Sequence, residues 1–208
     1  MKRPKGIFAK RDEPVTASDL VLTLPDEESE FVRQTYQAAN RILEYGSGGS
    51  TTLAVSLGKP VISVESDATW AKELALKINQ MGPEQDTKVV HMDIGPTAAW
   101  GKPADMSGYA TYCRYPLAIW DDPSLGTPDV VLVDGRFRAG CVFATALRCQ
   151  IPTRVLVDDY VERPHYRVIE DLFAPTQIVG RMAVFDISPG QDLRNSMTII
   201  AESFADWR

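Results

Sequence analysis

Apolar residues along this chain alternate between helical spacing and short continuous runs. Phe31, Val32 and Ala39 recur with Thr35 at helical spacing behind Pro25-Asp26, which predicts an amphipathic helix over residues 26–39. Short apolar runs predict buried strands at 41–45, 61–64, 89–93, 130–133 and 155–157, and two late strands near 177–187 and 197–201. Helical spacing returns between them, at 50–57, in a helix capped at Ser66-Asp67, through 141–149, and in a helix opened by Pro164.

This alternation predicts one α/β domain built on a seven-stranded sheet. Strands separated by helices pair in parallel, with helices on both faces, while the two closing strands have no helix between them, so the final strand pairs antiparallel. Residues 95–127 break the rhythm with several prolines and glycines, and with Trp100, Tyr109, Tyr112, Tyr115 and Trp120. They predict a lid or substrate loop, or alternatively a packed surface loop anchored by its aromatic side chains.

A glycine-rich turn follows the first predicted strand, and an acidic residue ends the second. Gly46, Ser47, Gly48, Gly49 and Ser50 lie between a strand and a helix. Such a turn presents backbone N–H groups and the positive end of a helix at the carboxyl edge of the sheet. Glu65 follows about twenty residues later, where a carboxylate can accept both hydroxyl protons of a ribose. The alternative is a tight turn that only allows close packing.

The spacing of the glycines distinguishes between nucleotide ligands. A dinucleotide site favours G-x-G-x-x-G, but Thr51 occupies the third glycine position. S-adenosylmethionine (SAM) fits better, because its carboxylate and sulfonium are smaller than a pyrophosphate and because Glu44 adds an anion to meet the amino and sulfonium charges.

The segment Ile42-Leu-Glu-Tyr-Gly-Ser-Gly-Gly-Ser-Thr51 resembles the first motif, E/D-x-G-x-G, of class I SAM-dependent methyltransferases. The resemblance spans roughly residues 40–204 and is strongest to methyltransferase-like proteins of unassigned substrate. It implies a Rossmann-like methyltransferase fold, a ribose contact for Glu65 and an adenine contact for Asp93. It also implies that Asp134 is the acidic residue ending the fourth strand.

Three carboxylates, Asp134, Asp158 and Asp159, are predicted to meet where the fourth and fifth strands end. Their arrangement resembles that of catechol and caffeoyl-CoA type O-methyltransferases, which hold a divalent metal with an Asp and an Asp-Asn pair, although Asp159-Tyr160 stands where Asp-Asn is expected. Oxygen ligands of this kind suit Mg²⁺. A second interpretation is that these aspartates only cap their turns.

Proton transfer without a metal is a further possibility. Asp134, Asp159, Tyr160 and His165 are then the candidate catalytic side chains, and His91 is expected to be a core residue. Arg136 and Arg138 follow Asp134 and can receive an acidic substrate, or can simply be solvated.

The amino-acid composition limits the classes of molecule that the protein is expected to bind. The net charge of −6 disfavours nucleic acid and anionic membranes as partners, and neither the amine nor the cytosine C5 motif of DNA methylases is present. The three cysteines and two histidines form no zinc-like cluster and fit a reducing compartment, and residues 1–17 form a basic tail that is too polar for a signal peptide. We therefore expect a cytoplasmic methyltransferase acting on a small molecule, with a hydroxyl oxygen as the expected acceptor. The alternative is a non-catalytic SAM- or nucleoside-binding module.

Overall fold

A seven-stranded sheet forms the centre of the computed structural model, which describes residues 22–83 and 86–208. The strand order is β3-β2-β1-β6-β7-β9-β8. Strands β3, β2, β1, β6 and β7 are parallel to one another, and β9 runs antiparallel to both of its neighbours. The bounds are β1 Ile42–Tyr45, β2 Val61–Glu65, β3 Lys88–His91, β6 Val130–Val133, β7 Thr153–Val157, β8 Gln177–Val179 and β9 Met182–Ile187. The predicted fold class is confirmed.

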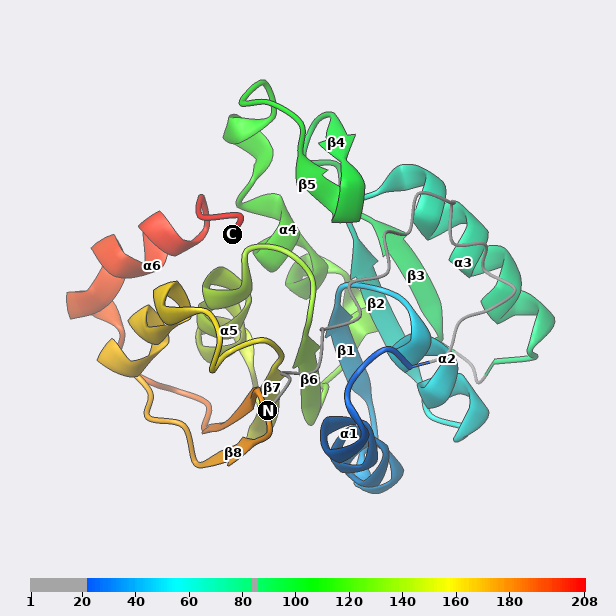
Figure 1. The fold of residues 1–208 in the computed structure, drawn as a ribbon. Helices are drawn as coiled ribbons and strands as arrows, with labels where there is room; N and C mark the ends of the chain where they lie inside the picture. The colour runs from blue at the N-terminus through cyan, green and yellow to red at the C-terminus, as the bar shows by residue number, and fades with distance from the viewer. Residues whose placement is uncertain (1–21, 84–85) are drawn as a thin grey trace, which may run out of the picture.

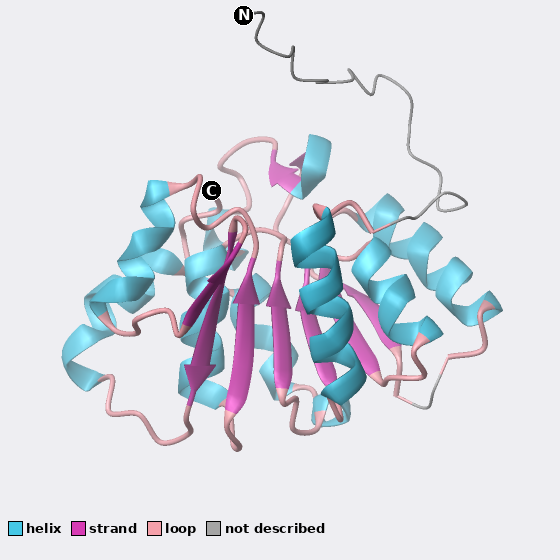
Figure 2. Ribbon diagram, turned by 60° about the horizontal axis from the view of Figure 1, so that its bottom comes forward, coloured by secondary structure: helices cyan, strands magenta, loops and turns pink. Residues whose placement is uncertain are grey.

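Helices cover both faces of this sheet (Figures 1 and 2). On one face lie α1 Asp26–Ala38, α2 Gly49–Ser56 and α3 Ala68–Gln80, and on the other lie α4 Arg114–Leu117, α5 Arg138–Arg148, the 3-10 helix η6 Pro164–Asp171 and α6 Met197–Ser203. Alternate strand residues divide between two buried clusters. In β6, Val131 and Val133 pack toward α5, while Val130 and Leu132 pack toward α1.

The carboxyl ends of the five parallel strands meet at one edge of the sheet, which is the upper edge in Figure 2. The turns after β1, β2, β6 and β7 all lie there, so the glycine turn and the three aspartates share this edge. Ligands of open parallel sheets bind at such an edge.

Two predictions about the end of the chain are wrong. Residues 197–203 form the helix α6, not a strand. The buried residues of this segment are Ile200 and Ser203, and a separation of three residues is helical spacing. The region 177–187 contains both closing strands, β8 and β9, joined by a turn at Gly180 that has a φ of +53°. The antiparallel pair therefore lies earlier in the sequence than predicted.

The segment 95–127 divides into two parts. Its first part carries the short strands β4 Thr97–Ala98 and β5 Lys102–Pro103, which project beyond the sheet edge (Figure 1). Trp100 and Tyr109 are exposed there, whereas Tyr112, Tyr115 and Leu125 in the second part are buried in the core. The second part is anchored as a packed loop, and lid motion of the first part stays a prediction. The tail predicted at residues 1–17 lies outside the residues that the structure describes.

His91 is not the core residue that its place in a strand indicates. It ends β3, an edge strand, and its side chain is exposed. The sequence pattern does not distinguish an edge strand from a central one.

Candidate active site

The glycine turn after β1 touches the turn after β6. Gly46 has a φ of +95°, and a Cβ on it would lie 2.6 Å from the backbone nitrogen of Gly135. Two backbones come this close only where neither residue carries a side chain. A Cβ on Gly48, in contrast, would meet no atom within 4 Å, so the turn presents open space on that side. The glycines thus serve two purposes, close packing at Gly46 and room at Gly48.

Glu44 lies beneath this turn and does not face the open edge. Its side chain is fully buried. Its carboxylate accepts hydrogen bonds from the Tyr36 hydroxyl at 2.6 Å and the Thr51 hydroxyl at 2.5 Å. The Thr51 hydroxyl in turn accepts from the Gly48 N–H at 3.0 Å. Burial raises the pKa of Glu44, and the hydroxyl donors oppose that rise. Glu44 therefore fixes the shape of the turn through Thr51.

Glu65 ends β2 beside the same turn. One carboxylate oxygen accepts from the backbone N–H groups of Ser66 and Asp67, at 2.7 and 2.9 Å. The other accepts only the Ser47 N–H, at 3.2 Å, among the hydrogen bonds of the described residues. Gly101 packs so closely that a Cβ there would lie 3.2 Å from the carboxylate. Glu65 thus joins the two turns and keeps one oxygen with free lone pairs.

The remaining predicted cofactor residues lie at the same edge. Trp70 in α3 donates its indole N–H to the Ser47 carbonyl at 2.8 Å, which ties the glycine turn to the helix after β2. Asp93 follows β3, is exposed, and accepts the Gly95 N–H at 2.9 Å. The structure therefore lines up the predicted residues along the carboxyl ends of β1, β2 and β3.

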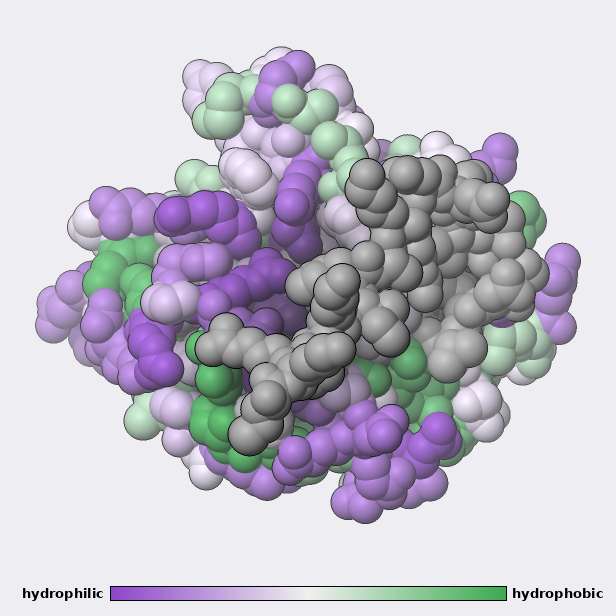
Figure 3. Space-filling model, viewed as in Figure 1, coloured by the Kyte–Doolittle hydropathy of each residue, from purple (hydrophilic) through white to green (hydrophobic). Residues whose placement is uncertain are grey.

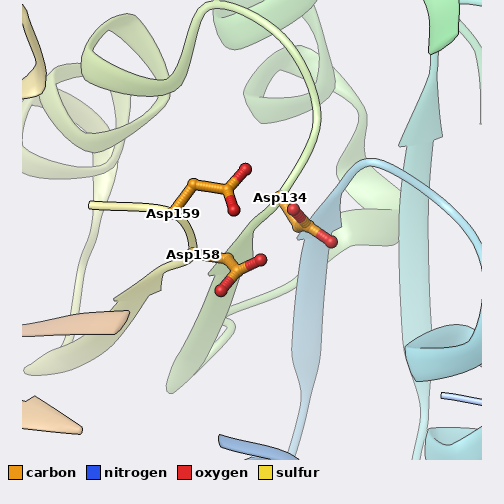
Figure 4. A group of neighbouring side chains, drawn as sticks. All are labelled: Asp134, Asp158 and Asp159. Carbon is orange, nitrogen blue, oxygen red and sulfur yellow. The ribbon is translucent and has the colours of Figure 1, made fainter. Parts of the chain in front are cut away.

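On the other half of the edge, the three aspartates converge as predicted (Figure 4). Asp134 follows β6, and Asp158 and Asp159 follow β7. One oxygen from each carboxylate lies within 4.8 Å of the others. Asp159 has a φ of +56°, an unusual conformation for a residue with a side chain. Such strain persists only where the surroundings hold it, and functional sites are common places for it.

Three arginines surround these aspartates. Arg181 binds both oxygens of Asp158, at 3.0 and 2.6 Å. The Asp159 carboxylate meets Arg163 at 2.7 Å, Arg138 at 3.2 Å and Arg181 at 3.3 Å. Arg138, which is 2% exposed, also binds Asp134 Oδ1 at 3.0 Å. Guanidinium groups thus contact five of the six carboxylate oxygens.

This arrangement does not fit a divalent metal. A Mg²⁺ ion needs several oxygen ligands at about 2.1 Å in octahedral geometry. Here only Asp134 Oδ2 has no guanidinium contact among the described residues, and three positive charges already balance the three negative ones. A metal would have to displace arginines, one of them almost wholly buried. The arrangement therefore leaves too few free carboxylate oxygens for the divalent metal that the sequence suggested as an alternative.

Asp134 differs from its two neighbours. Its side chain is 38% exposed, against 1% for Asp158 and 13% for Asp159. Burial of the carboxyl, opposed by Arg138 and reinforced by the charges of Asp158 and Asp159, raises the pKa of Asp134 to about 6. Asp134 pairs with Arg138 through one oxygen only, so its other oxygen can exchange a proton with a ligand. Both oxygens of Asp158 and of Asp159 are held by guanidinium groups.

Tyr160 and His165 have other contacts. Tyr160 is buried, its ring packs edge-on against Phe185, and its hydroxyl donates to Glu170 at 2.8 Å. Burial and Glu170 raise its pKa, which makes it a poor base. His165 packs edge-on against Tyr166, and its Nε2 is buried without a partner in the described part of the chain.

Several residues of this site are not predicted from the sequence. Tyr36 and Thr51 hold Glu44, and Arg163 and Arg181 hold the aspartates. The buried polar position Tyr36 in α1 is the one signal the sequence offers for the first pair. Arg163 lies four residues after Asp159, but the sequence does not show that its side chain turns back toward that carboxylate. Arg181 is more distant in sequence from its partners, and no local pattern connects them.

The glycine turn follows β1, one acid ends β2 and another follows β6, on a sheet of order β3-β2-β1-β6-β7-β9-β8. This topology is that of a class I methyltransferase-type fold. A structure search finds a methyltransferase-like protein from Silicibacter pomeroyi with 41% identity and a TM-score of 0.84. The match covers 90% of this chain and 98% of the other. The chain belongs to these methyltransferase-like proteins, within the class I SAM-dependent methyltransferases.

More distant structures share the fold. They include the cofactor-bound protein Rv0187 from MTB, with 17% identity, a TM-score of 0.55, and coverage of 84% of this chain and 86% of that one. A putative caffeoyl-CoA O-methyltransferase from Staphylococcus aureus has 10% identity, a TM-score of 0.56, and coverage of 81% and 86%. No family model and no curated protein sequence matches the chain. Within the described residues, no helix is long and apolar enough to cross a membrane.

Proposed function

We propose that this enzyme transfers the methyl group of SAM to a hydroxyl oxygen of a small molecule, with Asp134 accepting the hydroxyl proton. The observation that carries the proposal is the half-open Asp134 carboxyl, whose pKa is raised to about 6, at the edge that also holds the glycine turn. A base with a pKa near the working pH is suited to proton transfer.

The cofactor is proposed to lie along Gly46–Ser50. The open side of Gly48 gives it room, and the free lone pairs of Glu65 accept hydroxyl protons of the ribose. Ser47 and Ser50 border this space, and Asp93, after β3, is assigned to the adenine amino group. Glu44 is a positioning residue here, since its carboxylate faces Tyr36 and Thr51.

The acceptor is proposed to lie on the Asp134 side of the cofactor. Its hydroxyl oxygen attacks the methyl carbon while the carbon–sulfur bond breaks, so S-adenosylhomocysteine (SAH) leaves and the proton passes to Asp134. Holding the oxygen in line with the sulfonium supplies most of the acceleration in such a reaction. The small-molecule acceptor is supported by the acidic balance of the chain, which disfavours nucleic acid.

The test measures cofactor binding and transfer separately. Calorimetric titration of the protein with SAH is expected to show one site per chain, and a panel of hydroxylated small molecules is then assayed for SAH release. Transfer only to amines, thiols or nucleic acid would contradict the proposed acceptor. SAH binding without transfer to any member of a broad panel would favour a binding module.

A further inference from the structure

One arginine at the aspartate edge differs from the three that hold the carboxylates. Arg136 follows Asp134 and Gly135 in the turn between β6 and α5. Its residue surface is only 8% exposed, and its Nε is buried with no hydrogen-bond partner. Among the described residues, no hydrogen bond or ion pair involves its guanidinium group. A largely buried guanidinium whose Nε is out of reach of both solvent and a partner is costly, so such a group calls for an explanation.

The backbone around Arg136 is fixed firmly. Its carbonyl accepts the Cys141 thiol at 3.5 Å, and the next residue, Phe137, lies in the left-handed region with a φ of +53°. The Phe137 ring is fully buried against the rings of Tyr112 and Tyr115, at 5.3 and 5.4 Å. A non-glycine residue tolerates that conformation only when packing enforces it. The turn therefore fixes the backbone from which the Arg136 side chain extends.

The charges at this edge leave Arg136 unbalanced. The carboxylates of Asp134, Asp158 and Asp159 are matched by three other arginines, so the fourth guanidinium has no anion in this part of the structure. Burial and the nearby charge of Arg138 lower the pKa of Arg136. An arginine nevertheless stays protonated at neutral pH. The turn after β6 thus carries one positive charge that no carboxylate of the described residues compensates. The molecular face viewed in Figure 3 has hydrophilic residues around a recess.

We infer that Arg136 binds an oxyanion of the methyl acceptor, so that the substrate is a small hydroxylated molecule bearing a carboxylate or phosphate group. The planar guanidinium fork matches both groups with paired hydrogen bonds. Asp134 and Arg136 belong to the same turn after β6, so an acceptor whose anionic group binds Arg136 is proposed to place its hydroxyl group toward Asp134. This inference rests on the proposed function, and the cofactor's own carboxylate is the other source of the same chemistry.

The experiment uses benzoate and phenyl phosphate as anionic probes and benzamide as a neutral control of similar shape. Each probe is titrated calorimetrically, at low ionic strength, into the full chain saturated with SAH. The parent is expected to bind the two anions and not benzamide. Arg136→Gln is expected to bind them roughly tenfold or more weakly, because a charge-assisted pair is lost. Arg136→Lys, which keeps the charge but not the fork, is expected to fall between the two.

Three outcomes of the titrations overturn the inference. They are failure of the parent to bind either anion, equal anion binding by Arg136→Gln, or a tenfold loss of SAH affinity in Arg136→Gln, which would assign the guanidinium to the cofactor. Failure of the proposed function looks different, because it appears as no SAH binding by the parent or as no transfer to hydroxyl groups, and neither is read from the binding of the anionic probes. Anion binding that depends on Arg136 without any SAH binding would separate the two.

Thermal unfolding supplies a readout that a purely structural arginine would not give. Arg136→Gln removes an unpaired buried charge, so its unliganded midpoint is expected to equal or exceed that of the parent, and phenyl phosphate is expected to raise only the parent's midpoint. Arg194→Gln is the matched control, since Arg194 is 87% exposed and pairs only with Asp192 in the described structure. It is expected to bind the probes as the parent does. A large loss of stability in Arg136→Gln would instead assign Arg136 to the fold.

Discussion

The two halves of the carboxyl edge treat their acidic residues in opposite ways. On the β1–β2 half, Glu44 and Glu65 are held by neutral donors, namely hydroxyl groups and backbone amides. On the β6–β7 half, Asp158 and Asp159 are held by guanidinium groups. Neutral donors leave the negative charge of a carboxylate in place, whereas arginines cancel it.

This difference matches the charges of the two proposed ligands. SAM carries a sulfonium and an ammonium group, and the β1–β2 half keeps a negative potential for them. The β6–β7 half is neutral apart from the extra cation of Arg136, so it suits an acceptor that is neutral or anionic. The two environments meet where the neighbouring strands β1 and β6 end.

The largest expected effect comes from the contact that joins the two halves. Gly46→Ala places a Cβ 2.6 Å from the Gly135 nitrogen at a φ of +95°. We expect the free energy of unfolding to fall by roughly 2–4 kcal/mol, measured by denaturant titration. Gly48→Ala is the matched control, because its Cβ meets open space, and its stability is expected to change by less than about 1 kcal/mol. Equal stability of both variants would show that the contact is dispensable.

The next effect concerns Asp134, the one aspartate of its half that is partly open. Asp134→Asn is expected to lower methyl transfer roughly 100-fold, the scale of one acid–base contact, while stability changes by less than about 1 kcal/mol. In the parent, transfer is expected to rise with pH through about 6, because the deprotonated carboxylate is the base. The groups that set this pKa besides burial are Arg138, Asp158, Asp159 and Arg181.

Rate measurement between pH 5 and 8 checks the assignment. The step near pH 6 is expected to disappear in Asp134→Asn. Asp192→Asn, at an exposed aspartate paired with Arg194, is the control and should keep the step. Full activity of Asp134→Asn would remove the base and leave positioning alone as the mechanism.

A smaller effect is expected on the cofactor half. Glu65→Ala should weaken SAH binding by about 1.5 kcal/mol or somewhat more, through lost hydrogen bonds between the carboxylate and the ribose. Glu65→Gln keeps one acceptor and is expected to lose less. Glu73→Ala, at an exposed position in α3, is the control. Unchanged SAH affinity in a folded Glu65→Ala protein would place the ribose elsewhere.

The sequence predicts the cofactor half better than the acceptor half, for a physical reason. The turn from Gly46 to Ser50 and its acid Glu65 follow from local patterns, because a strand, a glycine turn and a helix are contiguous in the chain. The partners of Asp134, Asp158 and Asp159 are Arg138 at the start of α5, Arg163 just before η6, and Arg181 in the turn between β8 and β9. Arg138 and Arg163 lie four residues from an aspartate, but these segments are turns whose side-chain directions the sequence does not give, and Arg181 is more distant in sequence. The metal site inferred from the aspartates alone therefore could not be rejected from the sequence.

Helix and strand assignment fails where β-branched residues meet helical packing. Thr198, Ile199 and Ile200 favour a strand locally. In the structure, however, Ile200 belongs to the same buried cluster as the residues of α5, and Ser203 lies against Gly140. A Cβ on Gly140 would lie 2.7 Å from the Ser203 carbonyl oxygen, so α6 and α5 are in close contact. Tertiary packing of this kind overrides a weak local preference.

The smallest expected effect is that of metal removal. Treatment with EDTA is expected to leave methyl transfer unchanged, because guanidinium groups occupy the carboxylate oxygens that Mg²⁺ would need. The variant Arg181→Gln tests the reason for this expectation. It frees both oxygens of Asp158 and makes the net charge of the aspartate–arginine cluster more negative by one. That variant is expected to gain Mg²⁺ binding by calorimetry, while the parent shows none. The opposite pattern, transfer by the parent that EDTA abolishes and Mg²⁺ restores, would mean that the arginines move aside for a metal and that the two halves are less different than their charges indicate.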